Sequence, residues 1–171
     1  MKIVILGGTG LIGKALQKSF SNEHQVHCFN REAFQSVKHL ASLVEGSDLV
    51  IQLSGSTISK RWSNKIVKEM WQSRVDTNQM LSEVVQSLST KPRVICASGI
   101  SFYAESSCND PKTEEDPKGD GYLTNLNIAI EDAAKSISDD VIILRFGVVL
   151  SRQGGALQTV SYTHLTLPTK A

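Results

Sequence analysis

The chain has 171 residues, 40% of them hydrophobic, and 18 basic against 17 acidic side chains give a formal net charge of +1. This length suits one α/β domain with a substantial core and leaves no room for a second complete domain. Because the chain has no basic block and no alternation of aromatic and basic residues, we expect neither nucleic acid nor a membrane surface as a partner.

Two further features of the composition predict a cytoplasmic protein. The apolar run at the N-terminus is too short for a signal peptide and leads into glycines instead of a cleavage site. Cys28, Cys96 and Cys108 lack paired spacing, which is typical of reduced thiols. The histidines show no metal-ligand spacing, so we expect no metal site.

The first thirteen residues organise the rest of the chain. Residues 2–6 form a β-branched apolar run, typical of a strand buried on both faces of a parallel sheet. The next segment fits two overlapping dinucleotide-binding patterns, and a helix over residues 11–20 follows. Such glycines allow a tight turn and a close approach of the backbone to a pyrophosphate at the helix N-terminus. The predicted cofactor-binding residues here are Gly7, Gly8, Thr9, Gly10, Leu11, Ile12 and Gly13; the alternative is a purely structural turn.

A second strand is predicted over residues 25–29, ending at Asn30 and Arg31. At this place a NAD-specific site usually carries an acidic residue for the ribose 2′-hydroxyl, whereas an arginine suits a 2′-phosphate. Asn30 and Arg31 are therefore predicted to lie at the cofactor, with NADP preferred and NAD as the alternative. A solvated loop arginine is the other interpretation.

Residues 32–46 have helical spacing but no convincing strand, whereas residues 49–53 form a second buried strand that ends in Ser54 and Gly55. In a doubly wound parallel sheet this strand lies beside the first, across the point where the strand order reverses. Gly55 would then face Gly7 across the crevice. The alternative is an ordinary glycine at the end of a strand.

The second half continues the alternation of helices and strands. A helical pattern from residue 66 to residue 88 is mostly core, and a strand over residues 93–97 has Ser98 at its carboxyl edge. An exposed loop over residues 105–121 precedes a helix over residues 122–135 and a strand over residues 141–146. The predicted fold is therefore an α/β doubly wound parallel sheet of the Rossmann type.

Several motifs in this order resemble a known family, the atypical extended short-chain dehydrogenase/reductases labelled sugar-nucleotide epimerase-like. Some bacterial members carry an old cell-division-inhibitor label. The resemblance covers about residues 1–158. It is carried by Gly7 to Gly13, Leu53-Ser-Gly55, Arg61-Trp62, Ser73-Arg74, Ser98, Arg145 to Leu150 and Gly154 to Leu157.

The resemblance implies a Rossmann domain that binds NADP, a smaller substrate-binding region in the C-terminal half, and a small-molecule substrate such as a sugar nucleotide. By position, Gly7, Gly10 and Gly13 would hold the pyrophosphate, Arg31 the adenosine phosphate, and Leu53, Ser54 and Gly55 the cofactor near its nicotinamide ribose. Ser98 would be the catalytic serine that hydrogen-bonds a substrate carbonyl or alcohol. Read without the family, a serine at a strand end is more often a cap or turn residue. Arg145 would help to complete the cleft or form a structural ion pair.

The second catalytic candidate, Tyr122, departs from the family pattern. These enzymes usually have Tyr-x-x-x-Lys, which places both side chains on one helix face so that the ammonium lowers the phenol pKa. Here position 126 is Leu126. Lowering a phenol pKa from near 10 to about 7 requires roughly 4 kcal/mol. Tyr122 therefore either transfers the proton or only packs and binds.

The last segment, residues 160–169, resembles the translation of a sequencing-library adapter. We therefore divide the chain into a Rossmann domain over residues 1–158, truncated before the substrate-binding region, and a non-native tail over residues 159–171. The alternative is a genuine short tail. The predicted function is a NADP-dependent oxidoreductase or epimerase of which this chain is an inactive N-terminal fragment; the alternative is a non-catalytic NADP-binding sensor.

Overall fold

The computed structural model describes residues 1–105 and 109–155. Strands and helices alternate along the chain, as expected. The elements are β1 (Lys2–Leu6), α1 (Leu11–Phe20), β2 (Gln25–Phe29), the 3₁₀ helix η1 (Arg31–Phe34), α2 (Val37–Val44), β3 (Leu49–Gln52), α3 (Asn64–Trp71), the π-helical turn η2 (Gln72–Asp76), α4 (Thr77–Ser87), β4 (Arg93–Gly99), the 3₁₀ helix η3 (Ile100–Phe102), α5 (Tyr122–Lys135), β5 (Ile142–Phe146), β6 (Leu150–Ser151) and β7 (Gly154–Gly155).

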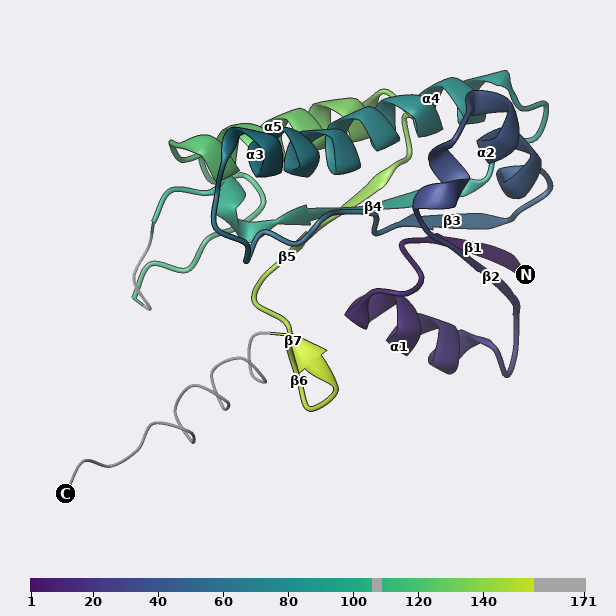
Figure 1. Ribbon diagram of the computed structural model, residues 1–171, viewed down its shortest axis with the longest axis horizontal. Coiled ribbons are helices and arrows are strands. Elements are labelled where there is room, and N and C mark those ends of the chain that lie inside the picture. Colours follow the sequence, from purple (N-terminus) through teal and green to yellow (C-terminus); the bar gives the residue numbers. More distant parts are fainter. Residues whose placement is uncertain (106–108, 156–171) are drawn as a thin grey trace.

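Five strands form one parallel sheet in the order β2-β1-β3-β4-β5 (Figure 1). The strand order reverses between β1 and β3, which pair directly, with Leu6 opposite Gln52. This confirms the predicted α/β sheet of the Rossmann type. The carboxyl ends of β1, β3 and β4 therefore meet at one edge of the sheet, where such folds bind ligands.

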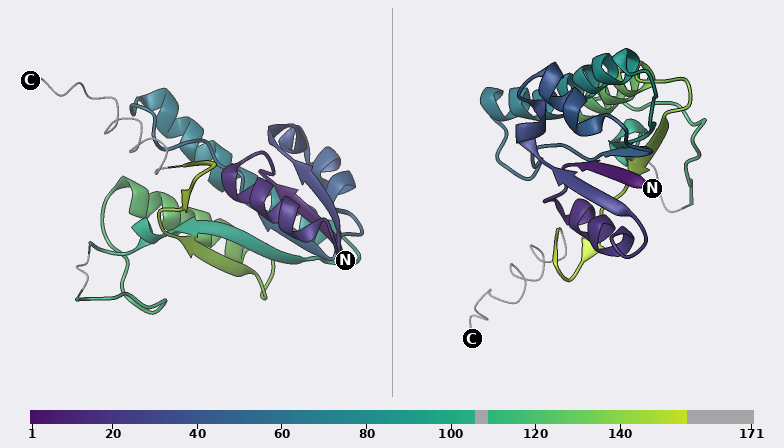
Figure 2. Two further views of the ribbon diagram at one scale, coloured as in Figure 1. Left: turned by 90° about the horizontal axis from the view of Figure 1, so that it is seen from below. Right: turned by 90° about the vertical axis from the view of Figure 1, so that its right-hand side faces the viewer.

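The two faces of the sheet are covered unequally (Figures 1 and 2). Helices α2 to α5 lie on one face and α1 lies on the other. Alternate residues of β1 serve the two layers: Val4 and Leu6 pack toward α2, α4 and α5, whereas Ile3 and Ile5 pack toward α1. All four side chains are buried, as expected for a strand covered on both faces.

Two stretches differ from a simple repeat of strand and helix. Residues 31–44 form η1 and α2 without a strand, and the Ser36 hydroxyl caps α2 by accepting from the His39 amide at 3.1 Å. The helical pattern over residues 66–88 is not one regular α-helix, because η2 interrupts it with a π turn. A π turn inserts an extra residue into a helix and occurs frequently at functional sites.

Further sequence predictions concern the cysteines, the division of the chain and membrane spans. Cys28 and Cys96 are free thiols, and burial raises the pKa of Cys96 to about 12. Cys108 and the boundary between residues 158 and 159 lie outside the described residues. Within residues 1–105 and 109–155, none of the helices is long and apolar enough to cross a membrane.

The turn between β1 and α1 brings backbone segments unusually close together. Gly7 has a φ of +92°, and a Cβ there would lie 2.8 Å from the carbonyl carbon of Leu53. At the buried Gly13, a Cβ would lie 2.6 Å from the Gly7 oxygen. Only glycine permits these contacts, so the turn fixes α1 against the ends of β1 and β3.

We predict that Gly13→Ala lowers the free energy of unfolding by about 2 kcal/mol or more, because the added methyl meets backbone atoms that cannot move independently. Gly147→Ala is the matched control: its added Cβ has 3.8 Å of space from Ile100, so a change within about 0.5 kcal/mol is expected. Urea unfolding measures both. Equal stability of the two variants would contradict this account of the turn.

Candidate functional site

The glycine turn opens onto a cavity of about 430 Å³, which we call the Gly10 cavity. Gly7, Thr9 and Gly10 line it from the turn, and Asn30 and Arg31 line it from the end of β2. Gly10 is the N-cap of α1 and provides no side-chain cap for the first amides of that helix. The free helix N-terminus, with its partial positive charge, therefore favours an anion there.

The remaining residues of the glycine motif support this turn. Gly8 is buried, and a Cβ there would lie 2.4 Å from the Cβ of Cys28, so Gly8 allows β2 to approach. Leu11 and Ile12 are half-buried in the first turn of α1. The side chain of Asn30 accepts from the amide of Thr9 at 3.1 Å and from its hydroxyl at 2.7 Å. Asn30 thus holds the glycine turn against the end of β2.

Arg31 also lines the Gly10 cavity, with its side chain 82% exposed. Its Nη2 is 2.9 Å from the Oε1 of Glu69 in α3. A second carboxylate, that of Glu32, accepts from the Asn30 amide at 2.8 Å, and backbone hydrogen bonds hold the pKa of Glu32 below its ordinary value. Arg31 therefore has an acidic partner from a helix 38 residues away, which the sequence pattern did not reveal.

A second cavity of about 520 Å³ lies beside the first, and we call it the Ser98 cavity. It contains residues from the carboxyl ends of β3, β4 and β5 and from α4 and α5. Leu53, Ser54 and Gly55 line both cavities. The strand end predicted to meet the cofactor therefore lies between them, and Gly7 and Gly55 share the Gly10 cavity as the strand order predicts.

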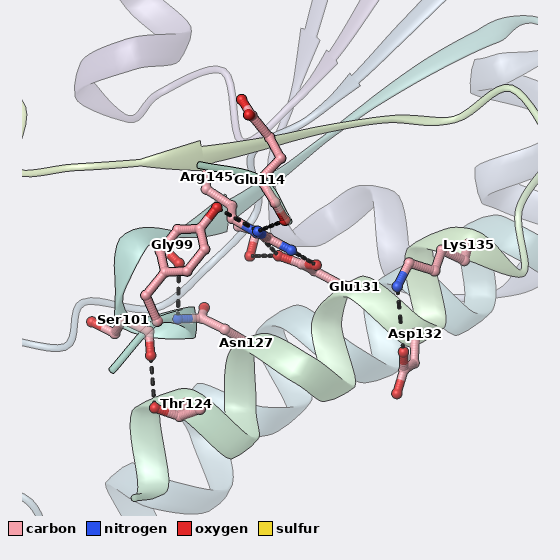
Figure 3. A network of polar contacts seen from close by, with 11 residues as sticks. Gly99, Ser101, Glu114, Thr124, Asn127, Glu131, Asp132, Lys135 and Arg145 are labelled. Carbon is pink, nitrogen blue, oxygen red and sulfur yellow. Dashed lines mark hydrogen bonds and ion pairs between the residues drawn. The ribbon is translucent and has the colours of Figure 1, made fainter. Parts of the chain in front are cut away.

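The Ser98 hydroxyl contacts a buried ion pair. Its hydroxyl donates to the Oε1 of Glu131 at 2.8 Å, and Glu131 is only 1% exposed. Arg145 donates to both oxygens of the same carboxylate, at 2.7 Å and 2.8 Å (Figure 3). While this arrangement holds, Ser98 can accept a hydrogen bond from a substrate alcohol but has no hydrogen to donate to a carbonyl.

The charge of Arg145 is held from several sides. Its guanidinium lies 3.6 Å from the centre of the Phe102 ring and also contacts Tyr103, whose hydroxyl accepts from Nη1. The hydrogen bond with Glu131 raises the pKa of Arg145. Burial alone would raise the pKa of Glu131, but the hydrogen bonds from Arg145 and Ser98 outweigh it and hold that pKa below its ordinary value. The ion-pair interpretation of Arg145 is thus confirmed.

The structure does not bring Tyr122 to Ser98. The Tyr122 hydroxyl donates to the Val67 carbonyl at 3.0 Å, and its ring packs edge-on against Trp62. Tyr122 does not line the Ser98 cavity, whereas Leu126, at the place of the usual lysine, is buried among apolar side chains. Among the described residues, no group of three or more His, Cys, Asp or Glu side chains is arranged to hold a metal.

The sheet order, the glycine turn and the paired cavities at the strand ends together define a Rossmann domain of the extended short-chain dehydrogenase/reductase class. The chain belongs to the NAD-dependent epimerase/dehydratase family, which it matches over residues 3–126. This match confirms the resemblance found in the sequence. This chain is 29% identical over 180 residues to epimerase family protein SDR39U1 of Mus musculus, and the match covers 98% of this chain and 59% of the mouse protein.

Solved structures of two relatives are similar in fold. The human epimerase family protein SDR39U1 (isoform 2), crystallised with NADPH, has a TM-score of 0.81 and 27% identity, covering 95% of this chain and 59% of that chain. The nucleoside-diphosphate sugar epimerase of Corynebacterium glutamicum has a TM-score of 0.79 and 27% identity, covering 99% of this chain and 39% of that chain. The chain therefore spans about three fifths of the curated mouse relative's length.

We predict that Glu131→Gln lowers the free energy of unfolding by about 3 kcal/mol at pH 7, because it leaves Arg145 without its carboxylate. Since Glu131 has a lower pKa when folded than when unfolded, its contribution is present above its ordinary pKa of 4.5 and is lost as the pH falls through the folded value. Urea unfolding from pH 7 to pH 3 should show this loss in the parent chain and a weaker one in the variant.

Asp132→Asn provides the control, because Asp132 forms an exposed pair with Lys135 at 3.8 Å on the same helix. It should change stability by no more than about 0.5 kcal/mol. If both variants retained the stability and the pH profile of the parent chain, the ion pair between Glu131 and Arg145 would contribute nothing to the free energy of unfolding.

Proposed function

We propose that the chain binds NADP across the Gly10 and Ser98 cavities, with NAD as the weaker alternative. The single observation that carries this proposal is the glycine turn that opens the uncapped N-terminus of α1 onto a cavity that Arg31 also lines. The NADPH bound by the similar human protein supports it. Gly13, whose missing Cβ lets α1 approach the turn, leaves the backbone open to a pyrophosphate.

In this arrangement the residues that line the two cavities contact different parts of the cofactor. Arg31 would hold the 2′-phosphate in place of its pair with Glu69, since a guanidinium binds phosphate oxygens with two parallel hydrogen bonds. Leu53, Ser54 and Gly55 would support the middle of the cofactor between the two cavities. The residues present therefore fit a phosphorylated dinucleotide.

For the whole protein we propose a NADP-dependent oxidoreductase or epimerase that acts on a small molecule. The similar Corynebacterium protein, a nucleoside-diphosphate sugar epimerase, supports a sugar nucleotide as the substrate class. When bound, the nicotinamide ring supplies or accepts the hydride. Ser98 accepts a hydrogen bond from the substrate hydroxyl while Glu131 keeps the serine hydrogen, which orients the reacting oxygen. The fragment status of this chain, its division at residue 158 and its cytoplasmic location stay predictions.

A second candidate function is a protein that binds NADP without turnover. The observation that favours it is the position of Tyr122, whose hydroxyl is engaged by Val67 outside the Ser98 cavity. With Leu126 at the usual place of the lysine, no ammonium of α5 supports a phenolate there. If the protein is an enzyme, water instead of Tyr122 would then transfer the proton.

We predict that the chain binds NADP more tightly than NAD. Arg31→Ala should lower the affinity for NADP roughly tenfold and leave the affinity for NAD unchanged. Glu69→Gln should tighten NADP binding, because it frees Arg31 from its ion pair. Calorimetric titration with each cofactor measures both effects. An unchanged ratio of NADP to NAD affinity in Arg31→Ala would remove Arg31 from the site.

A second prediction separates the enzyme from the sensor. In the full-length protein, Ser98→Ala should lower kcat by about 100-fold or more with NADP binding retained, because the substrate oxygen loses its positioning partner. Hydride transfer, followed by the absorbance of the reduced cofactor, measures this. Tyr122→Phe is the companion variant, and unchanged turnover there would assign Tyr122 to packing. Full activity of Ser98→Ala would refute the catalytic role of Ser98.

A further inference from the structure

Arg74 is a half-buried cation that none of the steps above uses. It lies in the π turn η2, where its Nη2 donates to the Ser56 carbonyl at 2.7 Å and its Nη1 to the Met70 carbonyl at 3.3 Å. Its partners are carbonyl and hydroxyl oxygens, and within residues 1–105 and 109–155 no carboxylate forms an ion pair with it. Burial accordingly lowers the pKa of Arg74. The protein thus keeps a positive charge partly out of water without a counter-charge, an arrangement that favours an anionic ligand.

The surroundings of Arg74 place this charge at the cleft. A Cβ at Gly55 would lie 2.9 Å from the guanidinium carbon of Arg74, so Gly55 leaves the space that the guanidinium fills. Gly55 belongs to the strand end shared by the two cavities, and Arg74 itself lines the Ser98 cavity. Because a π turn adds a residue, η2 changes the direction in which Arg74 and its neighbours leave the helix.

Three residues that line the Ser98 cavity each have a buried polar atom without a hydrogen-bond partner in the protein. These atoms are Nε2 of Gln52, Oγ of Ser54 and Oδ1 of Asn78. Gln52 is 3% exposed and Asn78 is 2% exposed. Buried polar groups are paired in the great majority of cases, so unpaired ones that line the same cavity as an unneutralised cation indicate a bound polar group.

The donor and acceptor types of this set define the ligand chemistry. Arg74 and Gln52 offer N–H donors, and the Ser54 hydroxyl can donate as well, which suits the oxygens of a phosphate. Asn78 offers an acceptor, because its amide nitrogen already donates to the Ile130 carbonyl at 3.2 Å. A phosphate alone would leave that acceptor unpaired. A phosphate that carries a neighbouring sugar hydroxyl satisfies both kinds of group.

We propose that Arg74, with Gln52, Ser54 and Asn78, forms a subsite for a phosphorylated sugar moiety in the Ser98 cavity. The phosphate contacts Arg74, and a hydroxyl beside it donates to Asn78. This inference rests on the proposed function only for the source of the phosphate, which is either the cofactor or a nucleoside-diphosphate substrate. The subsite itself is defined by the side chains on the cavity wall.

The test compares the 171-residue chain with Arg74→Gln by calorimetric titration against NADP, uridine diphosphate and inorganic pyrophosphate. We expect the variant to lose roughly 10- to 100-fold in affinity for the ligand whose phosphate it holds, since hydrogen bonds to charged groups have this magnitude. A loss for NADP alone assigns the subsite to the cofactor, and a loss for uridine diphosphate alone assigns it to the substrate. A loss for both supports a shared phosphate position.

Three variants make the result specific. Arg93→Gln removes the same charge from an exposed site at the opposite end of β4 and should leave all affinities unchanged. Arg74→Lys keeps the charge and should lose less affinity than Arg74→Gln. Gly55→Ala keeps Arg74 but displaces its guanidinium, so it should lower the affinity for uridine diphosphate and pyrophosphate even if Arg74→Gln fails to fold. Its NADP affinity is not used for this comparison, because Gly55 also lines the Gly10 cavity. Thermal unfolding of each variant confirms that it is folded.

The outcomes distinguish this subsite from the proposed function. If the folded parent chain binds neither NADP nor uridine diphosphate but binds pyrophosphate in a manner that depends on Arg74, the cofactor proposal fails, the phosphate position at Arg74 stands and the sugar contact with Asn78 is refuted. If Arg74→Gln and Arg93→Gln bind every probe alike, or if the parent chain binds none of the three, the subsite is refuted.

Discussion

The close approach of backbones at the glycine turn is the constraint on which the rest of the site depends. Gly7 lies against the carbonyl of Leu53, and Gly13 lies against Gly7, at separations that exclude any Cβ. These contacts set the start of α1 and the end of β3 at a fixed separation. The Gly10 cavity, the free amides at the helix N-terminus and the shared wall at Leu53 all follow from that one arrangement. The turn therefore positions the residues at the ends of β2 and β3 around the Gly10 cavity.

The parts that the sequence predicted correctly are those in which local pattern determines structure. The residue patterns specified all five strands of the sheet, and the glycine spacing specified the turn between β1 and α1. The position of β3 beside β1 followed from the general topology of doubly wound sheets. The bounds of α1 and α5 were also predicted, because their apolar periodicity and the flanking turn residues agree. For these elements, neighbouring residues carry enough information.

The groups that the sequence did not reveal depend on contacts between distant segments. Glu69 reaches Arg31 from a helix 38 residues away, and Glu131 joins Ser98 across 33 residues. The sequence around Glu69 or Glu131 does not distinguish either residue from a solvent-exposed glutamate, because a position in a helix does not by itself show whether the side chain is buried. The sequence likewise does not show where the hydroxyl hydrogen of Ser98 points. That direction decides whether Ser98 can donate a hydrogen bond to a ligand or only accept one. The chemistry of the strand edge is thus a tertiary property, even where its residues are visible locally.

The π turn η2 also makes this region unequally tolerant of change. Substitutions on the outer side of the helix leave its path intact, but removing one residue between Gln72 and Asp76 would restore a regular α-helix. A π turn takes up one extra residue within a widened turn, so the deletion would change the directions in which the side chains of the turn leave the helix. Arg74, which lies within the turn, would then lose its place on the wall of the Ser98 cavity. The segment is therefore constrained in length as well as in sequence.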